Sequence, residues 1–122
     1  MKTLILVLLS INFLSAANAA SVRSCAYSST THAIELDVVY TGGCKEHDFQ
    51  LKIVDACLES FPVQCVANVV DYTLDDPCKA IISKKISVSL KDAGLLDDTF
   101  NGAHLTIKGD LNSSCVLDLP RR

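Results

Sequence analysis

Beyond residue 20 the sequence has no apolar run long enough to cross a bilayer, so we expect no membrane span in the mature protein. It has no cluster of lysine or arginine, and its formal net charge is −3. Both features argue against binding to nucleic acid or to an anionic membrane surface. It also lacks a glycine-rich phosphate loop, an internal repeat and a linker-like stretch. The sequence therefore predicts one domain that binds neither nucleotides nor nucleic acid.

Signatures of catalysis and of helices are missing as well. No stretch keeps a 3.6-residue apolar period, which excludes amphipathic helices as the main elements. No nucleophile-elbow motif points to a serine beside a base. The number of cysteines is even, which argues that no thiol is free to act as a nucleophile. We expect no enzymatic activity and no cofactor.

What the sequence does have at its start is the pattern of a secretory signal. Residues 1–20 begin with Met1-Lys2, continue with an apolar stretch at 4–14 and end in small residues at 17–19. We expect cleavage after Ala19 or Ala20, which leaves residues 21–122 as a single disulfide-stabilised β domain. This pattern is most typical of a protein exported to the bacterial periplasm, and a eukaryotic secreted protein is the second choice.

Apolar and polar residues alternate along most of the mature chain, which is typical of half-buried β-strands. Two such segments, 34–40 and 48–53, flank Gly42-Gly43 and are interpreted together as a hairpin. Further strands are expected at 66–72, at 80–90, at 103–108 after the Asn101-Gly102 turn, and around Cys115. We expect an all-β fold, an antiparallel β-sandwich of about six to eight strands, with a barrel as the alternative.

Six cysteines in an exported chain indicate up to three disulfides, and fifteen pairings are open. Chain geometry ranks the pairings. The ends of two neighbouring strands carry Cys57 and Cys65, so a bond between them would close a hairpin loop. The first and last strands, which commonly meet in a sandwich, carry Cys25 and Cys115. That ranking leaves Cys44 with Cys78, both at turns. Each bond adds roughly 2–4 kcal/mol, so all three are interpreted as structural.

The loop that the first of these pairs closes carries the sharpest motif, Cys57-Leu58-Glu59-Ser60-Phe61-Pro62-Val63-Gln64-Cys65. It resembles the reactive loop of Bowman-Birk serine protease inhibitors, a disulfide-closed nonapeptide of pattern Cys-x-x-Ser-x-Pro-x-Gln-Cys. The resemblance implies that Glu59 fills the specificity pocket of a protease, that Ser60 follows the bond presented for cleavage, that Pro62 rigidifies the loop and that Gln64 braces it. It covers nine residues, and Leu58 stands where that family usually has threonine.

A preorganised loop loses little entropy when it docks, and this is the physical basis of a substrate mimic. We therefore expect an exported, non-enzymatic module that binds another protein through the loop residues Leu58, Glu59, Ser60, Phe61, Pro62 and Val63, with a serine protease as the most concrete partner. The alternative is an ordinary hairpin loop in which Phe61 packs inward and Pro62 shapes a turn. A structural protein of the cell envelope is a further alternative.

A second motif, Gly42-Gly43-Cys44-Lys45-Glu46-His47-Asp48-Phe49, is followed by Asp75-Asp76-Pro77-Cys78. It resembles a pattern of small exported bacterial β-domains of uncharacterised function, in which Gly-Gly-Cys-x-x-His-x-Phe precedes a later Asp-x-Cys or Asp-x-x-Cys. The resemblance implies bacterial export and a disulfide between Cys44 and Cys78, and it implies no activity.

His47 also has a spacing to Cys44 that metal ligands use, and a metal-binding periplasmic module is the alternative function. However, cysteines bind zinc or copper only as thiolates, and an oxidising compartment removes them. His47 also shares the alternation of Phe49 and Leu51. We therefore expect a hydrogen-bonded histidine at the edge of the core and no metal site.

Overall fold

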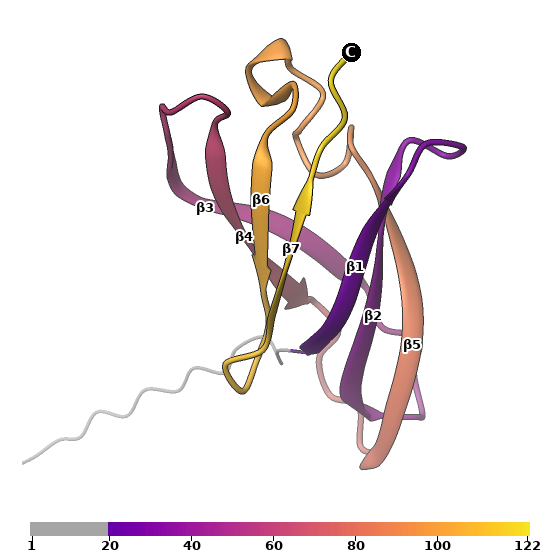
Figure 1. Ribbon diagram of the computed structural model, residues 1–122. Helices are drawn as coiled ribbons and strands as arrows, with labels where there is room; N and C mark the ends of the chain where they lie inside the picture. The colour runs from indigo at the N-terminus through magenta and orange to yellow at the C-terminus, as the bar shows by residue number, and fades with distance from the viewer. Residues whose placement is uncertain (1–19) are drawn as a thin grey trace, which may run out of the picture.

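The computed structural model describes residues 20–122, apart from the side chains of residues 55 and 56. Of the expected signal at 1–20, only Ala20 falls within the described residues. The described chain forms seven strands and one short 3₁₀-helix, η1 (Figure 1). Their bounds are β1 Ser21–Ser28, β2 Ala33–Gly42, β3 Phe49–Leu58, β4 Gln64–Asp71, β5 Ala80–Ser89, η1 Asp98–Phe100, β6 His104–Lys108 and β7 Ser114–Asp118.

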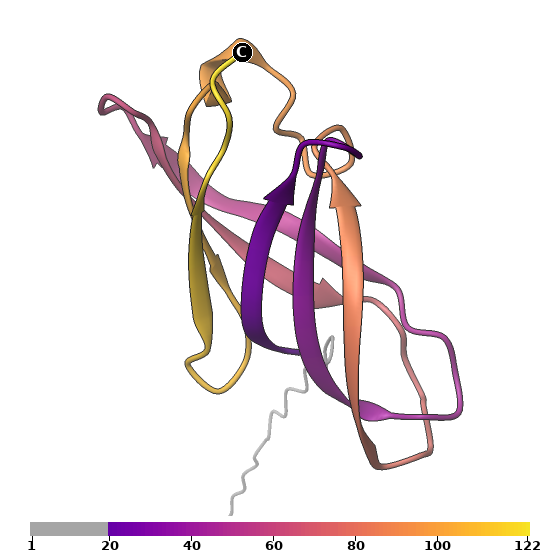
Figure 2. The same ribbon diagram turned by 45° about the vertical axis from the view of Figure 1, so that its right-hand side comes forward.

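The strands form two sheets that face each other, so the expected all-β sandwich is confirmed (Figures 1 and 2). One sheet has the order β1-β2-β5 and the other has the order β3-β4-β6-β7. The expectation of a purely antiparallel arrangement is wrong for one pair, because β4 and β6 are parallel. Between these two strands the chain crosses to β5 in the other sheet and returns. A long crossover of this kind is what parallel neighbours require.

The expected hairpin of 34–40 with 48–53 is also wrong. β2 is the central strand of its sheet and pairs with β1 and β5, whereas β3 pairs with β4 in the other sheet. Residues 43–48 therefore carry the chain from one sheet to the other. Within this crossing segment, the backbone N–H groups of Gly43, Cys44 and Lys45 donate to the carboxylate of Asp76.

The core lies between the sheets and follows from the alternation in the sequence. On β2, Ile34, Leu36 and Val38 are at most 1% exposed, and the inward side chains Leu105 and Ile107 of β6 are fully buried. Alternate residues of a strand point to opposite faces, so each strand contributes every second side chain to the core. Within residues 20–122, no helix has the length and apolar character needed to span a membrane.

Three disulfides join the pairs that chain geometry ranked, and the described residues contain no free cysteine. The Cys25–Cys115 bond links β1 to β7, which are edge strands of different sheets and lie side by side in Figure 1. One side of the sandwich is therefore closed covalently. On the other side, the edge strands are β3 and β5.

Candidate functional site

Residues 58–63, which are the last residue of β3 and the loop that joins β3 to β4, project from one end of the sandwich (Figure 1). The Cys57–Cys65 disulfide closes the base of this loop, where the two Cα atoms are 4.5 Å apart. Two apolar side chains face solvent, with Leu58 64% and Phe61 89% exposed. Glu59 and Ser60 between them are exposed as well. The exposed surface of this covalently closed loop therefore consists of residues 58–61, whereas Pro62 is half-buried and Val63 packs against the core.

Hydrogen bonds hold the loop from inside and from β6. The Ser60 hydroxyl donates to the carbonyl oxygen of Pro62 at 2.7 Å, and the Gln64 side-chain amide donates to the Ser60 hydroxyl at 3.4 Å. The backbone N–H of His104 donates to the carbonyl oxygen of Val63 at 2.8 Å. At 3.4 Å the Gln64 contact is long for a hydrogen bond, so the bracing role of this residue stays a prediction. The Phe61–Pro62 peptide bond is cis.

Phe61 does not pack inward as the ordinary-loop alternative expected, because its side chain is almost fully exposed, and the rest of that alternative stays open. The hairpin extends past the end of the sandwich, so its tip has no opposing sheet against which to pack. Instead, the Cζ atom of Arg121 lies 5.5 Å from the centroid of the Phe61 ring, which is a cation–π distance. Sequence reasoning did not find this contact, because it joins residues sixty positions apart without a local signal.

A second cluster lies at the opposite end of β3, around His47. Its Nδ1 atom is 2.5 Å from an Asp71 carboxylate oxygen, and its Nε2 atom is 2.7 Å from Asp76 Oδ2. The side chains of His47 and Asp71 are fully buried and that of Asp76 is 2% exposed. An ionised carboxylate only accepts hydrogen bonds, so with both acids ionised each ring nitrogen donates and the ring is an imidazolium.

The electrostatics of the cluster agree with a charged ring. Burial lowers the pKa of His47, but its hydrogen bonds to Asp76 and Asp71 outweigh burial, and the net pKa is raised above the ordinary 6.5. The His47 hydrogen bond likewise holds the pKa of Asp76 well below its ordinary 3.8 against the effect of burial, with help from the backbone N–H groups of Cys78, Cys44 and Lys45. The cluster is thus a buried ion network.

The surroundings of the ring explain why the chain has glycine and aromatic residues here. The Tyr40 ring packs on the imidazole with centroids 4.5 Å apart, and Phe49 stacks at 6.0 Å. A Cβ on Gly42 would lie 2.6 Å from Asp76 Oδ2 and 2.7 Å from His47 Nε2, so only glycine fits without displacing the network.

The expectation of a hydrogen-bonded histidine describes this position better than a metal ligand does. Both nitrogens of His47 face carboxylates, which leaves no ring lone pair for a metal ion. The sulfurs of Cys44 and Cys78, which lie near Asp76, are bonded to each other. Sequence reasoning missed Asp71 as a partner. The sequence did contain one indication of this partner. Asp71 is an acid at a position of β4 that points inward, as the buried Ala67 and Val69 do.

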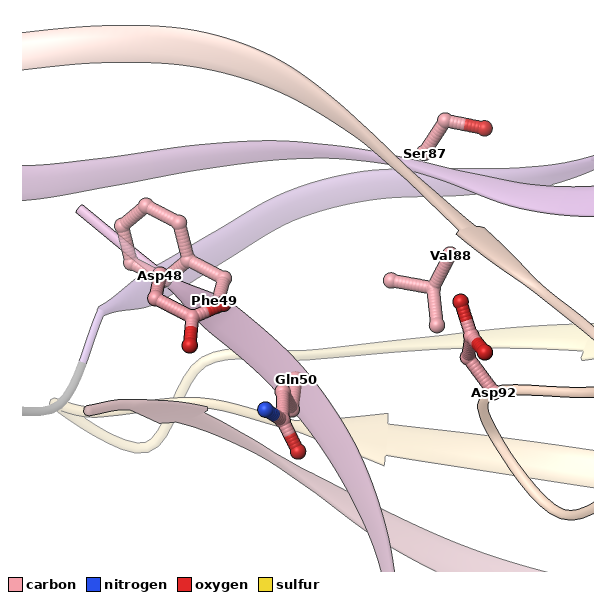
Figure 3. A pocket seen from close by; sticks show the side chains of 6 residues that line it. All are labelled: Asp48, Phe49, Gln50, Ser87, Val88 and Asp92. Carbon is pink, nitrogen blue, oxygen red and sulfur yellow. The ribbon is translucent and has the colours of Figure 1, made fainter. Parts of the chain in front are cut away.

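A pocket of about 500 Å³ lies at the open side of the sandwich, between β3 and β5 (Figure 3). Six residues line it: Asp48, Phe49, Gln50, Ser87, Val88 and Asp92. Figure 3 shows the side chains of 48–50 on one wall and those of 87, 88 and 92 on the other. None of these positions was predicted as a site, because the pocket exists only where the two sheets approach each other.

Comparison with known proteins adds no relative to these observations. No protein-family profile, no curated protein and no solved structure matches this chain.

Proposed function

We propose that the protein is an exported, non-enzymatic module that binds a serine protease through the loop closed by Cys57 and Cys65. The observation that carries the proposal is the state of the loop before any partner binds. It is closed by a disulfide, braced by the Gln64–Ser60–Pro62 hydrogen bonds, and still presents Leu58 and Phe61 to solvent. A loop that is ordered in advance loses little conformational entropy on docking, and more of its contact energy appears as affinity.

In this proposal the bound loop lies along the active site as a substrate does. The Glu59 side chain enters the specificity pocket, and the Glu59–Ser60 peptide bond faces the catalytic serine. Phe61 lies on the leaving-group side, where its ring offers the large exposed aromatic surface that is typical of interface anchors. The partner is a protease whose pocket accepts an acidic side chain.

Export is part of the proposal. Disulfides form and persist in oxidising compartments, so the presence of three supports export. Ala20 supports cleavage of the signal after Ala19, since its side chain is 1% exposed and its carbonyl oxygen accepts a hydrogen bond from the N–H of Asp110 at 2.8 Å. A mature chain that begins at Ala20 keeps this contact, whereas cleavage after Ala20 removes it.

The test uses the identity of the pocket residue. Wild-type protein is expected to inhibit a glutamate-specific serine protease competitively, and Glu59→Lys is expected to abolish that inhibition and to confer inhibition of a protease that cleaves after lysine, because the pocket selects the charge of this one side chain. The matched control is Glu46→Lys, the same charge change at an exposed acid near the other end of β3. It should leave both inhibition constants unchanged.

The inhibition constants come from steady-state kinetics with a chromogenic substrate and the full-length, disulfide-bonded mature protein. If wild type fails against glutamate-specific proteases at micromolar concentration, and Glu59→Lys also fails against lysine-specific ones, the loop is not a protease-binding loop. An equal change of specificity in Glu46→Lys would show that overall charge, and not pocket insertion, governs binding.

A further inference from the structure

The four edge strands of the sandwich differ in how they are protected against pairing with another chain. β1 and β7 are linked by the Cys25–Cys115 bond, β1 also carries a register shift, and β7 has only five residues. β3 carries a register shift toward its end. Short strands, bulges and covered edges are devices by which proteins avoid edge-to-edge pairing. β5 has none of these three devices.

β5 is a long and regular edge strand. Its ten residues pair with β2 without an irregularity, from Ala80 opposite Gly42 to Ser89 opposite Ala33, and it is the outermost strand of its sheet (Figure 1). In an antiparallel pair, every second residue directs its N–H and C=O groups away from the neighbouring strand. No strand of the described chain pairs with that free edge. β5 therefore keeps unused backbone donors and acceptors along its length.

One exposed side chain on β5 lacks a neighbour on the free side of the strand. Ile81 lies on the outer face of the sheet, opposite Thr41 of β2, and is 80% exposed. Cross-strand contacts between apolar side chains stabilise a sheet. A strand added at β5 would supply such a contact, and it would give both sheets four strands.

The middle of β5 carries two lysines, which lie on opposite faces of the sheet. The nearest acids are Glu46, 3.7 Å from Lys84 Nζ, and Asp37, 3.6 Å from Lys85 Nζ. The lysine side chains are nevertheless 37% and 68% exposed. Both positive charges are therefore accessible to a strand that approaches the free edge.

This charge decides which strand can pair with β5. Residues directly opposite each other in an antiparallel pair share a face. A second copy paired symmetrically about the middle of β5 would therefore set Lys84 against Lys84 or Lys85 against Lys85. Like charges directly opposite each other destabilise a sheet, whereas opposite charges stabilise it. The edge thus disfavours a second copy of this chain and favours a strand that carries an acid.

We propose that β5 binds an extended acidic segment of a partner protein, which joins the sheet as a fourth strand. Backbone hydrogen bonds to the free edge supply most of the affinity. An acid opposite Lys85 and an apolar side chain opposite Ile81, four positions away on the same face, fix the register. The inference is independent of the loop closed by Cys57 and Cys65, which joins two strands of the other sheet.

The test is a titration of isotope-labelled mature protein with the peptide acetyl-Glu-Thr-Thr-Thr-Ile-Thr-Glu-amide. When antiparallel to β5, this peptide places its first glutamate opposite Lys85, its isoleucine opposite Ile81 and its last glutamate near the exposed Lys79. We expect the backbone amide signals of residues 79–86 to shift in nuclear magnetic resonance spectra. Every second amide of β5 should also exchange its hydrogen more slowly, because the N–H groups of the free edge gain an acceptor.

Two control peptides separate charge from backbone pairing. In one, both glutamates are replaced by lysine. In the other, the central threonine is replaced by proline, which cannot donate to a sheet and disrupts the strand. Each should bind at least about fivefold more weakly than the acidic peptide. Added salt should weaken the binding of the acidic peptide, because the lysines of β5 are solvent-accessible.

A charge-reversed variant locates the contact on the protein. Lys85→Glu should weaken binding of the acidic peptide about two- to fivefold, the range for exposed ion pairs, and should strengthen binding of the lysine peptide. The matched control is Lys108→Glu, the same change at an exposed lysine of β6 in the other sheet, which should leave both affinities unchanged. Both lysines are exposed, so the variants are expected to fold, and thermal unfolding checks that they do.

Four results would overturn the proposal. The first is the absence of any shift in residues 79–89 at about 5 mM acidic peptide. The second is equally tight binding of either control peptide. The third is a Lys85→Glu variant that binds the acidic and lysine peptides as the wild type does. The fourth is a dimer in sedimentation experiments without peptide in which the same β5 amides are protected, because the occupant of the edge would then be a second copy.

Discussion

Replacement of His47 by glutamine tests whether the buried ion network stabilises the fold. Glutamine is neutral, so the variant leaves the carboxylates of Asp71 and Asp76 in one buried site without a positive charge. The His47 and Asp71 side chains are both fully buried. Removal of one partner from a buried pair costs about 3–5 kcal/mol, because the other charge remains desolvated. For a domain of this size that corresponds to a fall in Tm of at least about 12 °C.

The sequence offers a matched control for the same substitution. His104 Nδ1 is 2.8 Å from Asp118 Oδ1, but the two side chains are 40% and 75% exposed. An exposed pair contributes less than about 1 kcal/mol, so His104→Gln should unfold close to the wild-type temperature. Both variants are measured with disulfides intact, by urea unfolding followed by circular dichroism. A loss below about 1 kcal/mol for His47→Gln would refute the reasoning.

The pH dependence of stability provides a second readout. The folded pKa of His47 is raised above 6.5, so its stabilisation is fully present below pH 6.5 and is lost as the pH rises through the folded pKa. The folded pKa of Asp76 is lowered, so its stabilisation is present above 3.8 and is lost as the pH falls. We expect maximal wild-type stability between these two values. His47→Gln should not show the loss at high pH, and a flat wild-type profile between about pH 6 and 9 would contradict the assignment.

Two further predictions concern packing and cross-linking. Gly42→Ala should destabilise the protein by about 1–3 kcal/mol through overpacking, because the new Cβ would clash with Asp76 and His47. The control is Thr41→Ala at an exposed position, whose free energy of unfolding should stay within about 0.5 kcal/mol of wild type in the same urea assay. Loss of the Cys25–Cys115 bond by paired alanine substitution should cost about 4.6 kcal/mol, against about 2.5 kcal/mol for Cys57–Cys65, because the bonded cysteines are 90 and 8 positions apart. Equal losses for the two pairs would show that native-state contacts outweigh chain entropy.

The local pattern of the sequence was enough to predict strands, and it failed where pairing was decided at a distance. The alternation at 34–40 marks β2 correctly, and the segment from Phe49 belongs to β3. Their proposed hairpin is wrong, because register and partner depend on which sheet a strand joins, and alternation is the same in either sheet. The parallel contact of β4 with β6 has no local signal for the same reason.

The candidate sites divide in a similar way. The loop from Cys57 to Cys65 could be found from sequence, since its disulfide and its hydrogen bonds join residues within nine positions. The partners of His47 could not be found from the sequence, because Asp71 lies 24 positions away. The sequence indicates only that an acid occupies an inward position there, and it does not indicate which side chain that acid contacts. The pocket between β3 and β5 could not be found either, since its walls come from different sheets.

By itself, the sequence determined the period-two alternation that makes strands and the cysteine positions that make three covalent links between them. These features are local or depend only on the order of residues in the chain, so they can be predicted from the linear sequence. Only the tertiary structure decided which strands are neighbours, that Asp71 and Asp76 enclose His47, and that one edge of the sandwich stays open. Such features arise from packing between segments distant in the chain, where burial and charge are shared by residues that no sequence window contains together.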